Sequence, residues 1–232
     1  MSNAYMMTDE EAAVRTTERA FVNRVFMWMA AALIITAGVA AWTAQTPSLL
    51  KVVLTGHVMV GLLISEVLLV MLLSWLIARL SPVVAACMFI VYAALNGLTL
   101  SVIFLLYTAS SISSTFFVTA GTFGVMAAIG YTTRRDLTSL GSLLLMALVG
   151  VILASIANWI FFRSETLYWA MTYVGIAVFV GLVAYDTQKI KQMAVLEGTD
   201  EGRKAAVLGA LAIYLDFINL FLLILRLLGR RR

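Results

Sequence analysis

Hydrophobic positions along this chain gather into seven long runs, separated by short polar or charged connections. A helix needs about 20 apolar residues to cross the hydrocarbon core of a bilayer, and each run has close to that length. The alternation of apolar and polar residues that a transmembrane β-barrel requires is missing from these runs. The pattern therefore predicts an all-α, polytopic membrane protein. The predicted spans are residues 25–44, 58–78, 83–106, 113–131, 139–162, 168–186 and 205–228.

Composition agrees with this prediction. Apolar residues make up 62% of the 232 residues and charged residues only 12%, which excludes a soluble globular domain. Cys87 is the single cysteine, so the sequence offers neither a disulfide nor a cysteine metal site. Acidic residues such as Asp9 precede the first run, and the run lacks the features of a cleaved signal peptide. We therefore expect the first run to remain as a transmembrane helix.

The chain divides into two unequal parts. Residues 1–24 are polar and are expected to form a cytoplasmic or interfacial segment, with an amphipathic helix over residues 11–24 on the membrane surface. Residues 25–232 are expected to form one seven-helix transmembrane domain. Glycines inside the spans permit close contact between helices. These glycines are Gly121, Gly124, Gly141, Gly150, Gly175 and Gly181.

Lysine and arginine positions indicate the orientation, because cytoplasmic loops of membrane proteins are enriched in these residues. Ten lysine and arginine residues lie at the N-terminus and in the second, fourth and sixth connections, whereas only Lys51 and Arg163 lie in the first, third and fifth connections. The N-terminus is therefore predicted to be cytoplasmic. The tail, Arg230 to Arg232, then lies outside if all seven runs cross, or returns to the cytoplasm if the last run is re-entrant; we favour a full crossing. The basic residues on the predicted cytoplasmic side are Arg15, Arg19, Arg24, Arg79, Arg134, Arg135, Lys189, Lys191, Arg203 and Lys204.

Three acids lie within or at the ends of the spans. Because a carboxylate in hydrocarbon is energetically costly, an acid in such a position usually has a polar partner or a function. Glu66 falls in the second span, Asp186 at the end of the sixth and Asp216 in the middle of the seventh. Asn219 shares a helix face with Asp216, so Glu66, Asp216 and Asn219 are candidates for a cation pathway. The alternatives are structural. Glu66 then bonds a neighbouring Thr99 or Asn96, and Asp186 is an interfacial acid beside Lys189.

Asp186 and Asp216 are carried by consecutive spans, so they can meet. Two like charges about 4 Å apart repel by about 4 kcal/mol at an effective dielectric constant of 20, so such a pair should hold one proton between them. The shared proton ties the two spans together, and its loss leaves two negative charges that separate or recruit a cation. We therefore predict a pH sensor and gate at Asp186 and Asp216. As metal ligands, two carboxylates suit weak binding and passage of Ca²⁺ rather than a tightly bound cofactor.

Three motifs make the sequence similar to a known family. They are GLVAYDTQKI at 181–190, LDFINLF at 215–221 and TTRRDLTSLG at 132–141, within a match that extends from about residue 15 to residue 226. Together they resemble the Bax inhibitor-1 family, in its bacterial inner-membrane form. The resemblance implies seven helices with the last one central and surrounded by the other six. It also implies a pH-sensitive calcium leak with a di-aspartyl sensor at Asp186 and Asp216, Glu66 as the second-span acid and Arg79 as the arginine that latches the pair.

Other functional classes match parts of the sequence. Tyr185 and Asp186 match half of the signature of intramembrane aspartyl proteases, but Asp216 lacks the preceding glycine pattern, so we expect no enzyme activity. A serine protease needs a histidine inside the bundle, and the only one, His57, lies at the mouth of a span. The resemblance also allows a non-transporting regulator that binds another membrane protein, such as a membrane-bound protease or a cell-death factor. The expected partners are the lipid bilayer, Ca²⁺ and protons, with no nucleic acid.

Overall fold

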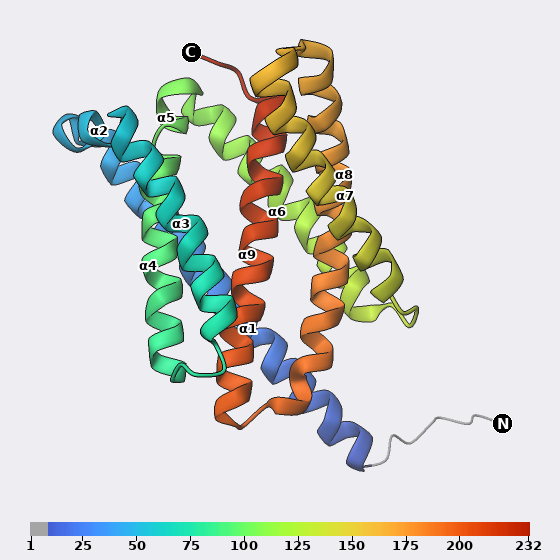
Figure 1. Cartoon of the computed structure of the whole chain (residues 1–232). Helices are drawn as coiled ribbons and strands as arrows, with labels where there is room; N and C mark the ends of the chain where they lie inside the picture. Colours follow the sequence, from blue (N-terminus) through green and yellow to red (C-terminus); the bar gives the residue numbers. More distant parts are fainter. Residues whose placement is uncertain (1–8) are drawn as a thin grey trace.

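A computed structural model describes residues 9–232, and this part of the chain is a bundle of long helices (Figure 1). Seven helical segments within it are long and apolar enough to cross a membrane, which confirms the predicted integral, multi-pass architecture. The elements are α1 (Asp9–Gln45), α2 (Pro47–Val53), α3 (Gly56–Leu76), α4 (Pro82–Leu100), α5 (Ile103–Leu106), α6 (Ala109–Thr132), α7 (Thr138–Ala157), the π-helix η1 (Asn158–Phe162), α8 (Glu165–Gln192), the 3-10 helix η2 (Met193–Leu196) and α9 (Asp200–Leu228).

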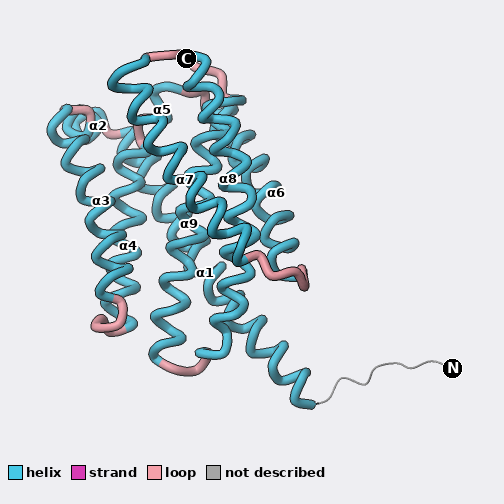
Figure 2. Tube along the Cα trace, turned by 45° about the vertical axis from the view of Figure 1, so that its right-hand side comes forward, coloured by secondary structure: helices cyan, strands magenta, loops and turns pink. Residues whose placement is uncertain are grey.

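The last helix lies in the middle of the bundle (Figures 1 and 2). In the most apolar 18-residue stretch of α9, 67% of the residues are buried, against 11% in the corresponding stretch of α3 and 6% in that of α7. Helix α9 packs mainly against α1, α4, α6 and α8, whereas α3 packs on α4 and α7 packs on α8. The expectation of a central last helix therefore holds, but four helices surround it directly and two form an outer layer.

The C-terminal tail lies at the opposite end of the bundle from the N-terminal end of α1 (Figure 1). Helix α9 is unbroken, so the last run crosses the whole bundle and is not re-entrant. Backbone hydrogen bonds hold the tail against the connection between α5 and α6: the Arg232 N–H donates to the Leu106 carbonyl, and the Thr108 N–H donates to the Arg230 carbonyl. The tail is thereby fixed at the end where α9 finishes.

Polar residues fix where the central helices begin. Thr199 caps α9 by accepting a hydrogen bond from the Gly202 N–H at 2.9 Å, and Asp200 occupies the first turn, where acids complement the helix dipole. Ser164 caps α8 in the same way, by accepting from the Leu167 N–H. Each cap satisfies an N–H group that the helix itself cannot pair.

Two helix boundaries differ from the sequence-based expectations. Helix α1 continues without a break across residue 25, and Phe21 is fully buried, so residues 11–24 are not a separate surface helix; residues 1–8 lie outside the described part. Helix α8 continues to Gln192, six residues past the predicted end at Asp186. Both errors have one cause. Polar residues end an apolar run, but they do not end a helix that remains packed against its neighbours.

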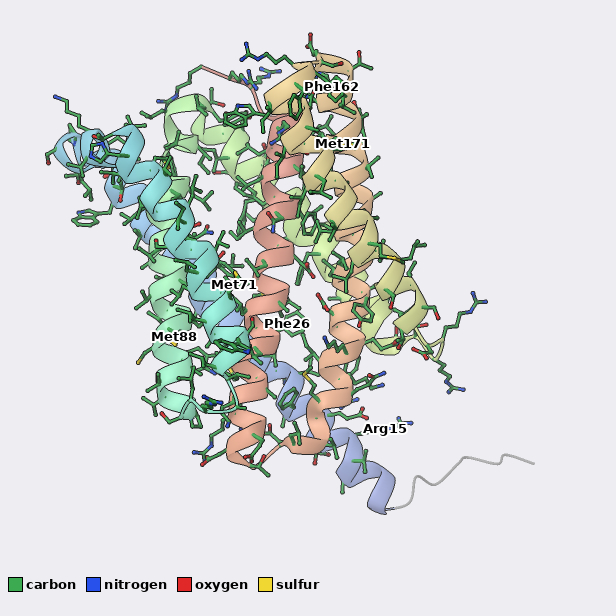
Figure 3. The ribbon with its side chains drawn as sticks, viewed as in Figure 1. Arg15, Phe26, Met71, Met88, Phe162 and Met171 are labelled. Atoms are coloured by element: carbon green, nitrogen blue, oxygen red, sulfur yellow. The ribbon has the colours of Figure 1, made fainter. Side chains whose placement is uncertain are left out.

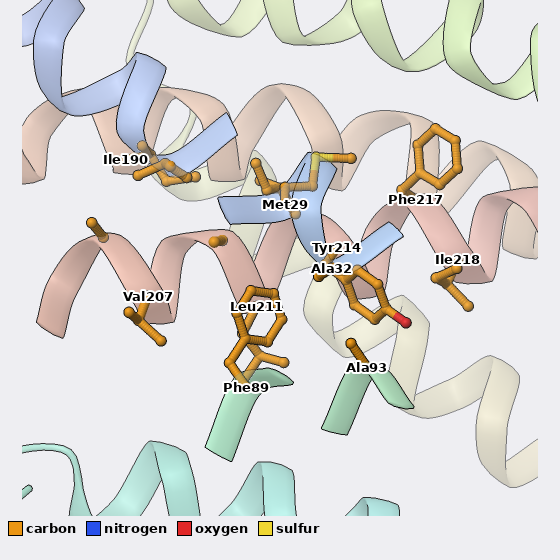
Figure 4. Close-up of a cluster of buried hydrophobic side chains, with 14 of the residues drawn as sticks. Met29, Ala32, Phe89, Ala93, Ile190, Val207, Leu211, Tyr214, Phe217 and Ile218 are labelled. Atoms are coloured by element: carbon orange, nitrogen blue, oxygen red, sulfur yellow. The ribbon is translucent and has the colours of Figure 1, made fainter. Parts of the chain in front are cut away.

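The core lies where α9 meets α1 and α4 (Figure 4). Tyr214 is fully buried, and Phe89 and Tyr92 of α4 both approach its ring edge to face, with ring centroids 5.7 and 5.9 Å away. Its hydroxyl lies 2.6 Å from Thr36 Oγ1, and that threonine also bonds the Ala93 carbonyl. A buried phenol requires such a partner, so this contact fixes α9 relative to α1.

Glycines allow α8 to approach α6 and α7 closely. A Cβ atom at Gly130 would collide with the Ala184 carbonyl, and one at Gly141 would collide with the Tyr185 ring. A Cβ atom at Gly181 would collide with the Leu144 side chain of α7, and one at Gly175 would lie 3.0 Å from the Leu223 side chain of α9. Close contact is thus confirmed for three of the six predicted glycines, while the space beside the other three, Gly121, Gly124 and Gly150, is open.

Candidate functional site

The structure brings the side chains of Asp186 and Asp216 together. Asp186 lies on α8 and Asp216 on the neighbouring α9, and the two carboxyl groups lie close enough to interact directly. Asp186 lies inside α8, which continues six residues past it to Gln192. The sequence-based juxtaposition of the two acids is therefore present in the folded chain.

The pair is shielded from solvent to different degrees. Asp216 is 5% exposed, and its Oδ2 atom has no hydrogen-bond donor among the described residues. Asp186 is half-buried, and Lys189 lies close enough to interact with it electrostatically. Because two carboxylates offer only acceptors, the contact becomes a hydrogen bond when one of them carries a proton. The arrangement can therefore hold or release one proton at the contact between α8 and α9.

Neighbouring helices hold the segment that carries Asp186. Gly130 of α6 and Gly141 of α7 contact Ala184 and Tyr185, the two residues immediately before Asp186. Such contacts bring the backbone of α8 close to α6 and α7, because glycines lack the side chains that would hold the helices apart. The position of Asp186 is thus set in part by the contacts of α8 with α6 and α7.

The connection between α6 and α7 is fastened to α8 just after the acid. Gln188 donates from Nε2 to the Arg135 carbonyl and accepts from the Leu137 N–H, each at 2.8 Å. In the same connection Thr138 donates its hydroxyl and its N–H to Asp136, which lowers the pKa of that exposed carboxyl. The role of Gln188 is not evident from the sequence, although this residue lies in the YDTQ motif.

Glu66 bonds Thr99, one of its two expected structural partners. It is buried in α3, and its Oε1 atom accepts a hydrogen bond from the Thr99 hydroxyl of α4 at 2.9 Å. Asn96, one turn earlier on α4, donates to the Tyr92 hydroxyl and leaves its own Oδ1 atom without a donor in the described part of the chain. Glu66 therefore belongs to a polar cluster on α3 and α4 and has no hydrogen bond to the aspartate pair.

The remaining two candidates do not reach the pair. Asn219 is half-buried and donates to the Leu215 carbonyl of its own helix, one turn from Asp216. Arg79 lies in the exposed turn after α3 and forms no ion pair with any described residue. The latch implied by the family resemblance is therefore not formed in this structure, because the second span ends before Arg79.

The chemistry of the pair suits a weakly held cation. No group of three or more His, Cys, Asp or Glu side chains that could hold a metal occurs among residues 9–232. Calcium takes six to eight oxygen ligands, and the aspartate pair supplies at most four. An ion at this site would keep several water molecules.

The comparisons agree with the motifs. The chain matches the family model described as inhibitor of apoptosis-promoting Bax1 over residues 18–232. It is 48% identical over 229 residues to the inner membrane protein YbhL of Escherichia coli strain K12, a match that covers 97% of each chain. An uncharacterised protein of Rickettsia prowazekii is 43% identical over 219 residues, covering 92% of this chain and 91% of that protein. The chain belongs to the Bax inhibitor-1 family of membrane proteins.

Proposed function

We propose that this protein is a pH-sensitive calcium leak channel of the bacterial inner membrane, gated by the contact between Asp186 and Asp216. The observation that carries the proposal is the meeting of two carboxyl groups at the packed interface of the central helix with α8. Acids inside a membrane are usually functional, since an idle carboxylate there is costly. A pair of them gives the membrane interior both a proton site and a cation site.

In the proposed gate, a shared proton holds the two carboxyl groups together, and electrostatic repulsion between two carboxylates separates them when the proton is lost. With one proton, the pair forms a carboxyl–carboxylate hydrogen bond that ties α8 to α9. Without it, two negative charges at contact distance repel by several kcal/mol, so the helices separate or a cation enters. Ca²⁺ flux should therefore rise with pH. Under this proposal, a conformation in which Asp216 is almost fully buried, as it is here, would correspond to the tied, closed state.

The proposed orientation of the chain rests on the distribution of its lysine and arginine residues, and the proposed membrane rests on similarity to the Escherichia coli relative. The excess of lysine and arginine at the N-terminal end favours a cytoplasmic N-terminus, which would leave the C-terminal tail outside. The printed name of the Escherichia coli relative, an inner membrane protein, supports the same membrane for this chain. Asp186 would then lie nearer the cytoplasm, and the proton pair would respond mainly to cytoplasmic pH.

The proposal is tested by reconstituting the full chain in liposomes that contain a calcium-sensitive dye. We expect wild-type flux to rise as pH increases, with a change of up to about tenfold per pH unit for a one-proton step. Asp186→Asn and Asp216→Asn should both abolish this pH dependence, because an amide cannot exchange the proton. Asp136→Asn is the matched control, since Asp136 lies in an exposed connection, and it should retain the wild-type pH profile.

Other outcomes would identify a different function. Flux that keeps its pH dependence in both Asn variants would make the acids structural. No flux at any pH would favour the non-transporting regulator. Cleavage of a transmembrane model peptide that both Asn variants abolish would instead favour an intramembrane aspartyl protease, and we expect no cleavage.

A further inference from the structure

A basic cavity lies at the end of the bundle where α1 begins and α6 and α8 end. Its volume is about 530 Å³, and Arg15, Arg19, Arg134 and Lys191 line it together with a single acid, Glu18. These cations come from three separate parts of the sequence. Four positive charges against one negative charge make the cavity a strong site for an anion.

The key cation of this cavity is held in place. Lys191 donates to the Tyr131 carbonyl at 3.3 Å, and its ammonium group lies 5.1 Å from the centre of the Tyr131 ring. Glu18 approaches the same ammonium at 3.8 Å, which leaves the arginines without an acid partner among the described residues. A neighbouring cavity of about 270 Å³ adds Arg135 and also Asp136, whose carboxylate already accepts two hydrogen bonds from Thr138.

An apolar groove continues from the basic cavity along the bundle. It has a volume of about 400 Å³ between α1 and α6, and Arg19 and Tyr131 line both spaces. Phe26 and Ala127 form its apolar walls, and nothing lies within 4 Å of a Cβ atom built on Gly124. Figure 3 shows Arg15 near the free end of α1 and Phe26 farther along the same helix, toward the centre of the bundle.

We propose that this composite cleft binds one membrane phospholipid with an anionic headgroup. The phosphate would lie among Arg19, Arg134 and Lys191, and one acyl chain would lie in the groove beside Gly124. A soluble phosphate compound would use the basic cavity alone, whereas only a lipid fills both spaces. Basic pockets between transmembrane helices commonly bind anionic headgroups in this way.

The site would also touch the helix that carries Asp186. Thr187 lines the apolar groove, and its side chain is almost fully buried. A bound acyl chain would therefore contact α8 one residue from the aspartate pair. The lipid site itself does not depend on the proposed channel function.

Native mass spectrometry of the delipidated full chain tests the proposal. Dioleoylphosphatidylglycerol should bind with a stoichiometry of one, while dioleoylphosphatidylcholine and glycerol 3-phosphate should bind far more weakly. Removing two cations in R19Q/K191Q should weaken binding by about 25-fold, at about fivefold per charge near the membrane surface. The matched control R79Q/R203Q removes two exposed cations outside the cleft and should bind as the wild type does.

A second pair of variants tests the acyl groove. Gly124→Leu should fill it and weaken lipid binding, and Gly121→Leu, at a similarly open position of α6 outside the groove, should not. Equal binding of the two lipids, or full binding of glycerol 3-phosphate, would overturn the proposal. Equal losses in a variant and its matched control would do the same. If Gly124→Leu fails to fold, the charge variants decide.

Discussion

Arg24 of α1 and Glu197, which follows η2, form an ion pair of 2.6 Å that joins the first helix to the turn before α9. Glu197 is the more buried partner, with 13% of its side chain exposed, and its second oxygen has no donor among the described residues. Replacing Glu197 by Gln should lower the free energy of unfolding by about 1–2 kcal/mol, because a partly buried arginine loses its counter-charge. Thermal unfolding in detergent measures this change.

The surface pair of Arg203 and Asp200 provides the control. Its atoms are 3.5 Å apart, and both side chains are more than 60% exposed. Asp200→Asn should therefore change stability by less than about 1 kcal/mol. Equal effects of Glu197→Gln and Asp200→Asn would contradict a structural role for the contact between α1 and the turn before α9.

Gly130 should be intolerant of any side chain. Gly130→Ala places a Cβ atom against the Ala184 carbonyl, so α6 and α8 must move apart, at a cost of about 1–3 kcal/mol. Gly121→Ala on the same helix meets open space and should be neutral or slightly stabilising. Melting temperatures of the two variants check this prediction, and a loss of stability in Gly121→Ala equal to that in Gly130→Ala would argue against close packing at Gly130.

Gln188 should protect the connection between α6 and α7. Gln188→Ala removes hydrogen bonds to Arg135 and Leu137, and opening of the connection should become about tenfold more frequent if the two bonds together contribute about 1.4 kcal/mol. Trypsin cleavage after Arg134 or Arg135 reports this opening. Gln192→Ala is the control, because Gln192 lies at the exposed end of α8, and an equal increase in its cleavage rate would refute the role of Gln188.

Glu66→Gln separates the two interpretations of Glu66. The Gln carbonyl can still accept the Thr99 hydrogen bond, so stability should change little, whereas the side chain can no longer carry a negative charge. If Glu66 lies on the cation pathway, calcium flux into liposomes should fall severalfold and keep its pH dependence. Unchanged flux would leave Glu66 with a structural role only.

The sequence was sufficient for the features that depend on composition and spacing along one helix. It predicted seven spans, and it placed Asp186 and Asp216 on consecutive spans that meet in the structure. It misplaced the end of α8, because Lys189 and Lys191 end the apolar run while the helix continues. Hydropathy marks where a helix can face lipid, and tertiary packing decides where the helix stops.

Sites formed by residues far apart in the chain could not be predicted from the sequence. Arg15, Arg134 and Lys191 line one cavity although more than a hundred residues separate the first two. Gly130 resembles the other glycines of the spans in sequence, and only the relative rotation of α6 and α8 makes it critical. Arg79 was assigned by resemblance alone, and the structure places it in an exposed turn.

The proton shared by Asp186 and Asp216 can be observed directly by infrared difference spectroscopy of the full chain in lipid, recorded as pH is raised. The spectra should contain the loss of one protonated carboxyl signal, and that signal should be absent from both Asp186→Asn and Asp216→Asn. Asp136→Asn should leave it unchanged. Persistence of the same pH-dependent signal, unaltered, in both pair variants, or its absence at every pH in the wild type, would contradict proton sharing between α8 and α9.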